Sequence, residues 1–222
     1  MKRARTKEEF ENWYSQHGGD PWGYEKAYIK KRLFASIEFV KRYTPSGFEG
    51  NFIEFGAFNG AFTYLLASDF PESTIYANDI SEMSLIEAKQ RNGKFSNILF
   101  YEHDMLCFDE KNYPRENAII LLLECLYYLD EDERHMMLLK LKTYFPEGNI
   151  VISGPISGSP YFTEEGITKL FEELGYSKKA INVLTLRKDL RMFSVIVTSI
   201  IKYSAFARRK LANQVIFWFE PK

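Results

Sequence analysis

Apolar residues in the middle of the chain follow two alternating spacings, and this pattern predicts alternating strands and helices. Short apolar runs predict strands over residues 52–55, 74–79, 98–102, 117–124 and 149–153. Helical spacing predicts helices over residues 60–68, 82–91, 130–144 and 163–174. Such an alternation is typical of βαβ units in a parallel sheet. The run NAIILLLE at 117–124 is the most continuously apolar strand, so we expect it at the centre of the sheet.

Two helices are predicted before the first strand. Residues 6–14 form the first, which the glycines and the proline of 16–21 end. In residues 24–43 apolar side chains recur at helical spacing, and 45–50 ends this second helix. We expect this second helix to pack on the sheet or over a pocket.

The C-terminal part has a different pattern. Strands are predicted over 180–186 and 214–220, with a long apolar helix over 192–211 between them. Two late strands separated by one long insert predict an antiparallel pair at the sheet edge. The helix ends in Arg208, Arg209 and Lys210. It is open to three interpretations: packing against the sheet, which its composition favours, a membrane-surface helix, and a contact between two copies of the chain.

Composition narrows the function. The 222 residues suffice for one α/β domain with a substantial core. Lysine and arginine number 29 against 30 acids, a net charge of -1, so we expect a small-molecule partner and no nucleic acid. Aromatic residues make up 16% of the chain, which is more than a core alone usually needs, so some are expected to line an apolar pocket.

Cysteine content and hydropathy bear on the compartment. Cys107 and Cys125 are the two cysteines and lack a CxxC spacing, which argues against a disulfide framework and against a zinc site. We therefore expect no bound metal and a reducing, cytoplasmic location. No run approaches the length of a transmembrane helix, and the basic start lacks the apolar core of a signal peptide.

A glycine-bearing turn follows the first core strand. In NFIEFGAFNG, Gly56 and Gly60 allow a sharp turn with the backbone close to a ligand, and the next helix directs its free N–H groups at that turn. Two glycines four residues apart are common in loops, and alone they indicate no more than an ordinary turn. Asp79, which closes the second strand, strengthens the signal because an acid there can bind both ribose hydroxyls.

Acids recur at the ends of the first four core strands. They are Glu54, Asp79, Asp104 and Glu124. Ligands bind at this edge of an open α/β sheet. Glu54 would hold an amino group and Asp104 the exocyclic amine of adenine, with Ile80 and Met105 as apolar faces for the ring. Each acid taken alone is equally well explained as a helix cap or a solvated carboxylate, whereas the ordered set describes a ligand with an adenosine and a cationic amino-acid end.

The segments EFGAFNG, YANDIS, EHDM and LECLYYL resemble the sequential motifs of class I S-adenosylmethionine-dependent methyltransferases. The resemblance covers residues 45–155 and is greatest to the nodulation-protein-S-like group of small-molecule methyltransferases. That group carries an Asp-Pro-Trp-Gly-Tyr segment before the core, present here at 20–24. It also carries a Glu-x-Leu-Tyr-Tyr-Leu segment, present here at 124–129.

The resemblance implies a three-layer, doubly wound, mostly parallel seven-stranded sheet of Rossmann-like methyltransferase type, with one antiparallel late strand. It implies a single domain over 1–222, with a helical cap or lid (1–44), a cofactor-binding core (45–155) and an acceptor-side part with the late strands (156–222). The implied cofactor is S-adenosyl-L-methionine, with S-adenosyl-L-homocysteine as product. Its expected contacts are Glu54, Phe55, Gly56, Ala57, Asn59, Gly60, Asp79, Ile80, Asp104, Met105 and Glu124.

Phe58 departs from the family pattern. The family usually has small residues between the two glycines of the turn, where this chain has Ala57, Phe58 and Asn59. Either the Phe58 ring points away into the core, or the site is reshaped. The other signature residues, Glu54 and Asp79 among them, keep their places, so we still expect the cofactor to bind.

Aromatic residues flank the expected acceptor side. The residues expected to contact the acceptor are Trp22, Tyr24, Tyr28, Tyr127, Tyr128 and Tyr161. Trp22, Tyr24 and Tyr28 would form a lid, or alternatively a staple that holds the N-terminal helix to the sheet. Tyr127 and Tyr128 would orient an acceptor, or alternatively pack on the sheet.

Methyl transfer needs an in-line approach of the acceptor with water excluded, and a hydroxyl acceptor also needs a base. Candidates are Glu124 and Tyr128, with His103 and His135 as weaker ones. The predicted activity is methyl transfer to a nitrogen or oxygen of a small molecule such as an amine, an amino sugar or a natural-product intermediate. Two alternatives are a nicotinamide-dependent oxidoreductase, which should show G-x-G-x-x-G, and a binding module without turnover.

Overall fold

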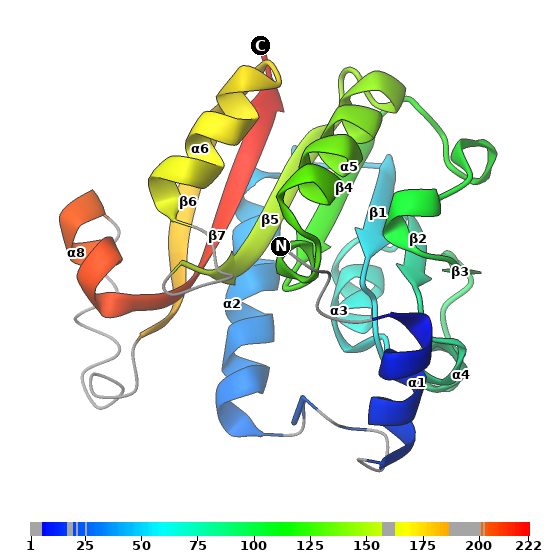
Figure 1. The fold of residues 1–222 in the computed structure, drawn as a ribbon. Coiled ribbons are helices and arrows are strands. Elements are labelled where there is room, and N and C mark those ends of the chain that lie inside the picture. The colour runs from blue at the N-terminus through cyan, green and yellow to red at the C-terminus, as the bar shows by residue number, and fades with distance from the viewer. Residues whose placement is uncertain are drawn as a thin grey trace.

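The computed structural model describes residues 6–16, 20, 22–24, 26–156, 163–186, 201 and 203–222. Its centre is a seven-stranded sheet of order β3-β2-β1-β4-β5-β7-β6 (Figure 1). The strands are β1 (Asn51–Phe55), β2 (Thr74–Asp79), β3 (Ile98–Glu102), β4 (Ala118–Leu123), β5 (Asn149–Pro155), β6 (Tyr176–Leu186) and β7 (Ala212–Pro221). Strand β7 runs antiparallel to both its neighbours, and the other pairs are parallel. The predicted fold is confirmed, including the central place of β4.

Helices cover both faces of the sheet (Figure 1). They are α1 (Lys7–Gln16), α2 (Ala27–Tyr43), α3 (Ala61–Asp69), α4 (Glu82–Arg91), α5 (Glu131–Tyr144), α6 (Glu164–Glu173) and α8 (Ala205–Leu211). Side chains of α5 and α6 share one hydrophobic cluster with one face of the sheet, and those of α2 and α3 share a second cluster with the other face. Three short 3-10 turns, η1 (Met105–Cys107), η2 (Glu110–Asn112) and η3 (Leu126–Tyr128), follow β3 and β4.

The alternation of side chains explains why the central strands are apolar throughout. In β4, Ile120 and Leu122 join the cluster under α5 and α6, whereas Ile119 and Leu121 join the cluster under α2 and α3. A parallel strand covered on both faces needs apolar residues at every position. Glu54 in β1 is one exception, and its carboxylate accepts a hydrogen bond from Thr63 of α3 in the interior.

Helices α3, α4 and α5 follow β1, β2 and β4 along the chain and begin near the carboxyl edge of the sheet. Helix α4 begins at Ser81, whose side chain accepts a hydrogen bond from the Ser84 amide, and α5 begins with a reciprocal capping box between Asp130 and Glu133. These caps satisfy amides that have no partner within the helix. They also fix the strand-to-helix loops at the edge where the candidate residues lie.

The C-terminal insert is described only in part. The predicted helix over 192–211 falls largely on residues outside the described ones, and the described part forms α8. Arg208 of α8 is buried and pairs with Glu164 of α6, so the predicted basic end is in part a packing contact. Strand β6 begins at Tyr176, earlier than predicted, because the chain from Tyr176 onward already pairs with the end of β7. Within the described ranges, no helix has the length and hydropathy that a membrane crossing requires.

Candidate functional site

A cavity of about 150 Å³ lies at the carboxyl edge of the sheet, where β1, β2, β3 and β4 end. Seven aromatic side chains contribute to its walls: Phe10, Tyr14, Trp22, Tyr24, Phe58, Tyr127 and Tyr128. The charged or titratable groups around it include Arg32, Asp79, His103, Asp104 and Glu124. A cavity with mostly apolar walls and a few convergent polar groups is typical of small-molecule sites. Its place at the ends of parallel strands is where open α/β sheets bind ligands.

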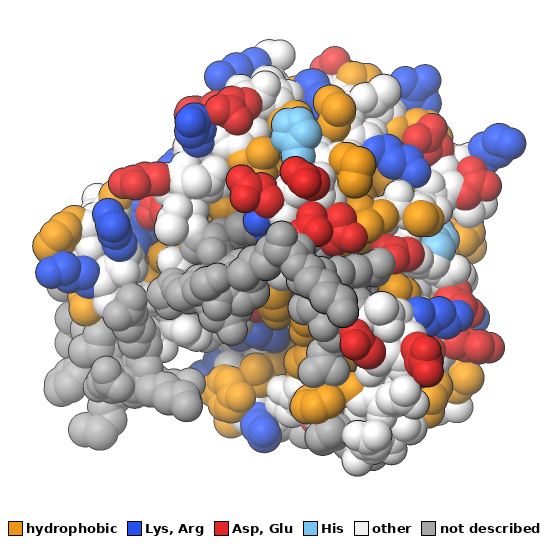
Figure 2. Space-filling view, in the orientation of Figure 1, with side chains coloured by type: hydrophobic (Ala, Val, Ile, Leu, Met, Phe, Trp, Pro, Cys, Tyr) orange, Lys and Arg blue, Asp and Glu red, His pale blue; other side chains and the backbone are white. Residues whose placement is uncertain are grey.

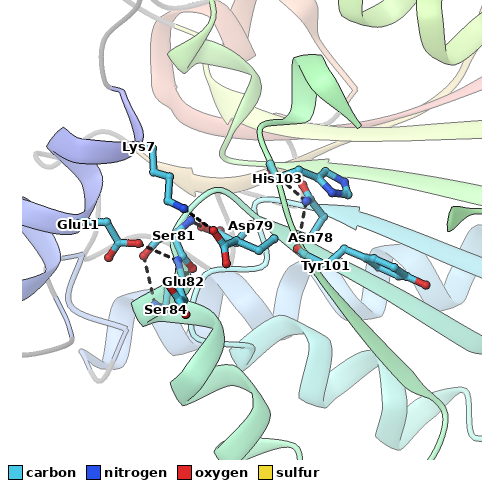
Figure 3. Close-up of polar contacts among 10 residues, drawn as sticks. Lys7, Glu11, Asn78, Asp79, Ser81, Glu82, Ser84, Tyr101 and His103 are labelled. Atoms are coloured by element: carbon cyan, nitrogen blue, oxygen red, sulfur yellow. Dashed lines mark hydrogen bonds and ion pairs between the residues drawn. The ribbon is translucent and has the colours of Figure 1, made fainter. Parts of the chain in front are cut away.

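The glycine turn is held against the end of β2. The amides of Gly56 and Ala57 both donate to the Asn78 carbonyl at 2.9 Å, and the Phe58 amide donates to Oδ2 of Asp79 at 2.8 Å. The other carboxylate oxygen of Asp79 accepts from the Ser81 amide at 2.9 Å (Figure 3). Burial raises the pKa of Asp79, and these two amides oppose that rise. Asp79 therefore has a fixed position between the turn and the start of α4.

Both glycines of the turn are needed for backbone geometry and for space. Gly56 and Gly60 have φ of 78° and 71°, values that favour glycine. A Cβ at Gly56 would lie 2.8 Å from Cβ of Cys125, and one at Gly60 would lie 2.4 Å from Nδ2 of Asn92. The turn thus packs directly against the segment after β4 on one side and against α4 on the other.

Phe58 points toward the N-terminal segment. It has a positive φ of 49°, and its ring lies 4.6 Å from the Trp22 ring, 5.0 Å from Tyr24 and 5.7 Å from Tyr14, between ring centroids. The ring is buried, but among aromatic side chains of the N-terminal segment and outside the two clusters on the sheet faces. Its ring is a wall of the cavity and joins the cap to the glycine turn.

Helix α1 lies beside α4 (Figures 1 and 3). Glu11 accepts a hydrogen bond from the Glu82 amide at 2.7 Å, and Lys7 pairs with Glu102 at the end of β3. Phe10 and Tyr14 of the same helix reach the cavity wall. These polar contacts of α1 are exposed, and exposed ion pairs contribute little stability. The cap is therefore held mainly by its aromatic side chains.

Glu54 lies behind the turn. It is buried and accepts a hydrogen bond from the Thr63 hydroxyl of α3 at 2.7 Å. Burial raises the pKa of Glu54 to about 7, with the Thr63 bond opposing the rise and the charge of Asp79 adding to it. Glu54 faces a second, smaller space of about 20 Å³, which Gly56, Arg32 and Glu124 also line.

Glu124 is held by three elements that are remote in sequence. Its oxygens accept hydrogen bonds from the Ser153 hydroxyl of β5 at 3.0 Å and from the Gln214 amide of β7 at 2.7 Å. Nη1 of Arg32, on α2, lies 3.4 Å from Oε2 of the same carboxylate. The backbone of Glu124 has a positive φ of 57° directly after β4. Strained backbone of this kind is common at functional sites, and here it directs the carboxylate into the cavity.

His103 and Tyr128 lie on different sides of the cavity. Nε2 of His103 is 2.6 Å from the Tyr113 hydroxyl, and partial burial lowers the pKa of His103. The Tyr128 hydroxyl accepts a hydrogen bond from Nε1 of Trp22 at 3.2 Å, so the Tyr128 segment contacts the N-terminal cap. The carboxylate of Asp104 caps η1 through the Leu106 amide at 3.0 Å.

The structure brings most of the predicted residues together. Ile80, Met105 and Tyr127 also line the cavity, whereas Ala57, Asn59 and Gly60 supply the buried backbone behind it. Phe55 is buried under α5 and packs on Phe108 and Tyr113.

Tyr28 and His135 lie away from the cavity. Tyr28 is 44% exposed on α2 and is not among the residues that line the cavity. His135 is exposed on α5. Tyr161 lies outside the described residues. Arg32, Ser153 and Gln214 were missed by the sequence interpretation, since their patterns are those of an ordinary helix and two ordinary strands.

Comparison with known proteins connects this site to a family. The sequence profile of the nodulation protein S (NodS) family matches residues 14–152, more than half of the chain. No curated protein sequence is significantly similar to this chain.

Many solved structures share the fold. The N-methyltransferase NodS from Bradyrhizobium japonicum WM9, in complex with S-adenosyl-L-homocysteine, is 17% identical, with 95% of this chain and 97% of that chain covered and a TM-score of 0.66. Magnesium protoporphyrin IX methyltransferase (ChlM) from Synechocystis PCC 6803, with bound SAM, is 14% identical, with 100% of both chains covered and a TM-score of 0.69. The StiE O-MT (residues 942–1257) is 14% identical, with 89% of this chain and 78% of that chain covered and a TM-score of 0.61. This chain therefore belongs to the nodulation protein S family and has the fold of the class I S-adenosylmethionine-dependent methyltransferases.

Proposed function

We propose that this protein is an enzyme that transfers a methyl group from S-adenosyl-L-methionine to a nitrogen or oxygen atom of a small molecule. The observation that carries the proposal is the Asp79 carboxylate, fixed at the end of β2 by the amides of Phe58 and Ser81 on the wall of the cavity. Membership of the nodulation protein S family and the cofactors in the similar structures support it.

The residues present fit the cofactor. The Asp79 carboxylate lies on the cavity wall, fixed by the amides of Phe58 and Ser81, where an acid can accept hydrogen bonds from ribose hydroxyls. Ile80 and Met105 offer apolar faces to the adenine ring, beside Asp104. Gly56 lines the cavity without a side chain, so the amino-acid end of the cofactor can approach the backbone there, in front of Glu54.

The acceptor would enter on the side of the cap and η3. Trp22, Tyr24, Tyr127 and Tyr128 border that part of the cavity. S-adenosylmethionine supplies the electrophilic methyl group, so the protein has to orient the acceptor and exclude water. The aromatic walls exclude water, and the hydrogen bond from Trp22 to Tyr128 holds the cap over this side.

Methyl transfer to an N–H or O–H group requires that the acceptor lose a proton. A neutral amine attacks without prior loss of a proton, whereas a hydroxyl needs a base. The candidates remain Glu124, Tyr128 and His103, all of which line the cavity. Glu124 is the best placed of them, because Ser153, Gln214 and Arg32 fix the orientation of its carboxylate. Partial burial lowers the pKa of His103, which favours the neutral ring, the form that accepts a proton.

Transfer of tritiated methyl groups from S-adenosylmethionine tests the proposal. The wild-type protein is expected to label at least one acceptor in a panel of amines, amino sugars and sugar hydroxyls, and Asp79→Ala is expected to lose most of this activity. Binding of S-adenosylhomocysteine without labelling of any acceptor would favour the binding module instead. The oxidoreductase alternative has little support, because the turn lacks G-x-G-x-x-G.

A further inference from the structure

A chain of hydrogen-bonded side chains crosses β6 and β7 and ends at Glu124. The amide nitrogen Nε2 of Gln214, on β7, donates to Oε2 of Glu124 at 2.7 Å, and the Thr185 hydroxyl of β6 donates to Oε1 of Gln214 at 2.9 Å. Nδ2 of Asn213 in turn donates to the Thr185 hydroxyl oxygen at 3.3 Å. Glu124 lines the cavity, whereas the other three residues are not among those that line it. An effect of this chain on the reaction therefore has to pass through Glu124.

Every donor in the chain points toward Glu124. A carboxylate can only accept, so Gln214 presents its NH2 group to Glu124 and its oxygen to Thr185. Because Asn213 donates to the Thr185 hydroxyl oxygen, the hydroxyl proton of Thr185 is left for the Gln214 oxygen. The Thr185 hydroxyl thus selects one of the two orientations of the Gln214 amide. In the opposite orientation the amide oxygen would face the carboxylate, and the two acceptors would repel each other.

An irregular pairing of β6 with β7 makes the contact between Thr185 and Gln214 possible. Val183 lies opposite Val215, so a regular antiparallel register would put Leu184 opposite Gln214. The register shifts between Val183 and Thr185, and Thr185 lies opposite Gln214 instead. Side chains of opposite residues lie on the same face of a sheet, so the two side chains can meet there. Bulges of this kind are common next to active sites, where they redirect a side chain.

We propose that Gln214 and Thr185 are positioning residues for the methyl acceptor. They orient the Glu124 carboxylate so that it accepts a hydrogen bond from the N–H or O–H group that is to be methylated. This inference rests on the proposed function, and it adds to the acceptor site two strands that lie beyond residues 14–152, the part of the chain that matches the family profile. Asp79 ends β2, which β1 separates from β4 in the sheet, so loss of the chain should impair use of the acceptor and leave cofactor binding intact.

Tritium transfer and calorimetry measure these two effects separately. The acceptors are glucosamine, tyramine and catechol, of which the most rapidly labelled one is used for all variants. Thr185→Val removes the hydroxyl and is expected to lower kcat/KM for the acceptor by about 3-fold to 10-fold, while affinity for S-adenosylhomocysteine changes less than about twofold. Thr185→Ser keeps the hydroxyl and should restore most of the wild-type value. Ser177→Ala, the matched control, removes another hydroxyl bond between β6 and β7, to the Glu220 carbonyl, and should change neither quantity.

Gln214→Met keeps the length of the side chain and removes its polar end. It is expected to lower kcat/KM for the acceptor by about 10-fold to 100-fold, as for loss of a hydrogen bond to a charged group, again with little change in S-adenosylhomocysteine affinity. Because Thr185 acts through Gln214, addition of Thr185→Val to Gln214→Met should lower kcat/KM no further. Two residues that only stabilise the strand pair would instead give losses that multiply in the double variant.

The inference is overturned if Thr185→Val and Gln214→Met both keep the wild-type kcat/KM, and the proposed function then stands. It is also overturned if either variant loses S-adenosylhomocysteine affinity to the same extent as kcat/KM, because Glu124 would then serve the cofactor. If Gln214→Met does not fold, as judged by thermal unfolding, Thr185→Val and its rescue by Thr185→Ser decide the question. A wild-type protein that labels none of the three acceptors would contradict the proposed function and, with it, this inference.

Discussion

The backbone amide of Phe58 donates a hydrogen bond to Oδ2 of Asp79, at a distance of 2.8 Å. This bond joins the one bulky residue of the glycine turn to the acid that closes β2. The Phe58 ring also packs against Trp22 of the N-terminal cap. Phe58 therefore connects the glycine turn both to Asp79 and to the cap. The departure from the usual small residues thus adds an aromatic wall and leaves the turn in place.

Replacement of Asp79 tests the ribose site. Asp79→Ala is expected to weaken binding of S-adenosylhomocysteine by at least about tenfold, because hydrogen bonds to a charged group contribute about 1.5–3 kcal/mol. Calorimetry measures this affinity directly. His135→Ala, at an exposed position of α5, is the control and should bind like the wild type. Equal affinities for the two variants would show that the ribose site is misplaced.

Removal of the Phe58 ring should loosen the cap. Phe58 is 7% exposed and contacts three aromatic rings of the N-terminal segment, so Phe58→Ala is expected to lower the free energy of unfolding by about 3 kcal/mol. It should also speed proteolytic cleavage near residue 20. Phe34→Ala, which removes the same ring at a position that is 58% exposed, should cost less than about 1 kcal/mol. Urea unfolding that gives the same loss for both variants would contradict the packing role of Phe58.

Gly47 and Gly60 have the same backbone conformation, so alanine substitutions at these two positions distinguish backbone strain from a steric clash of the added side chain. Gly60 and Gly47 have φ of 71° and 70°, but a Cβ would clash with Asn92 and Ala88 at Gly60 and would meet nothing within 4 Å at Gly47. Gly47→Ala is expected to destabilise the protein by about 1–2 kcal/mol through φ alone. Gly60→Ala should lower the free energy of unfolding by clearly more than Gly47→Ala does, because α3 and α4 must also move apart. Thermal unfolding of the two variants measures the difference, and equal losses would mean that the turn has room for a side chain.

The buried carboxyl of Glu54 makes stability depend on pH. Its pKa is raised from 4.5 to about 7 in the folded protein, so between these values the folded state keeps a proton that the unfolded state has released. The stability contributed by the neutral carboxyl is therefore lost as pH rises from about 4.5 to about 7, a change on the order of 3 kcal/mol.

Glu54→Gln keeps an acceptor for Thr63 and cannot ionise. We expect the free energy of unfolding of the wild type, measured in urea, to fall relative to that of Glu54→Gln between pH 5 and pH 8. Thr63→Val, which removes the one hydrogen bond that favours the ionised form, should steepen the fall. Parallel pH profiles for the wild type and Glu54→Gln would show that Glu54 titrates normally.

The alternation of apolar residues was sufficient to predict the sheet and the residues at its edge. Strands β2 and β3 and helix α4 have the bounds that the pattern predicted, because each is a short apolar or amphipathic run closed by turn residues. The position of Asp79 could be predicted as well, because an acid that ends a buried parallel strand lies at the edge of the sheet where ligands bind.

Contacts between remote segments could not be read from the pattern. Arg32 resembles its exposed neighbours Lys30 and Lys31 in sequence, and its burial depends on how α2 crosses the sheet. The partners of Glu124 on β5 and β7 depend on strand order. The direction of the Phe58 ring depends on the fold of the cap. On the surface, the face in Figure 2 shows acidic and basic side chains interspersed, and its described residues form no continuous basic area, consistent with the balanced composition.

The central claim is that the cavity at the end of the sheet binds a methyl donor and not a hydride carrier. Calorimetric titration of the wild-type protein with S-adenosylhomocysteine and, separately, with NADH tests it most directly. The account predicts binding of one S-adenosylhomocysteine per chain and no heat of binding from NADH. Binding of NADH with none of S-adenosylhomocysteine would contradict it.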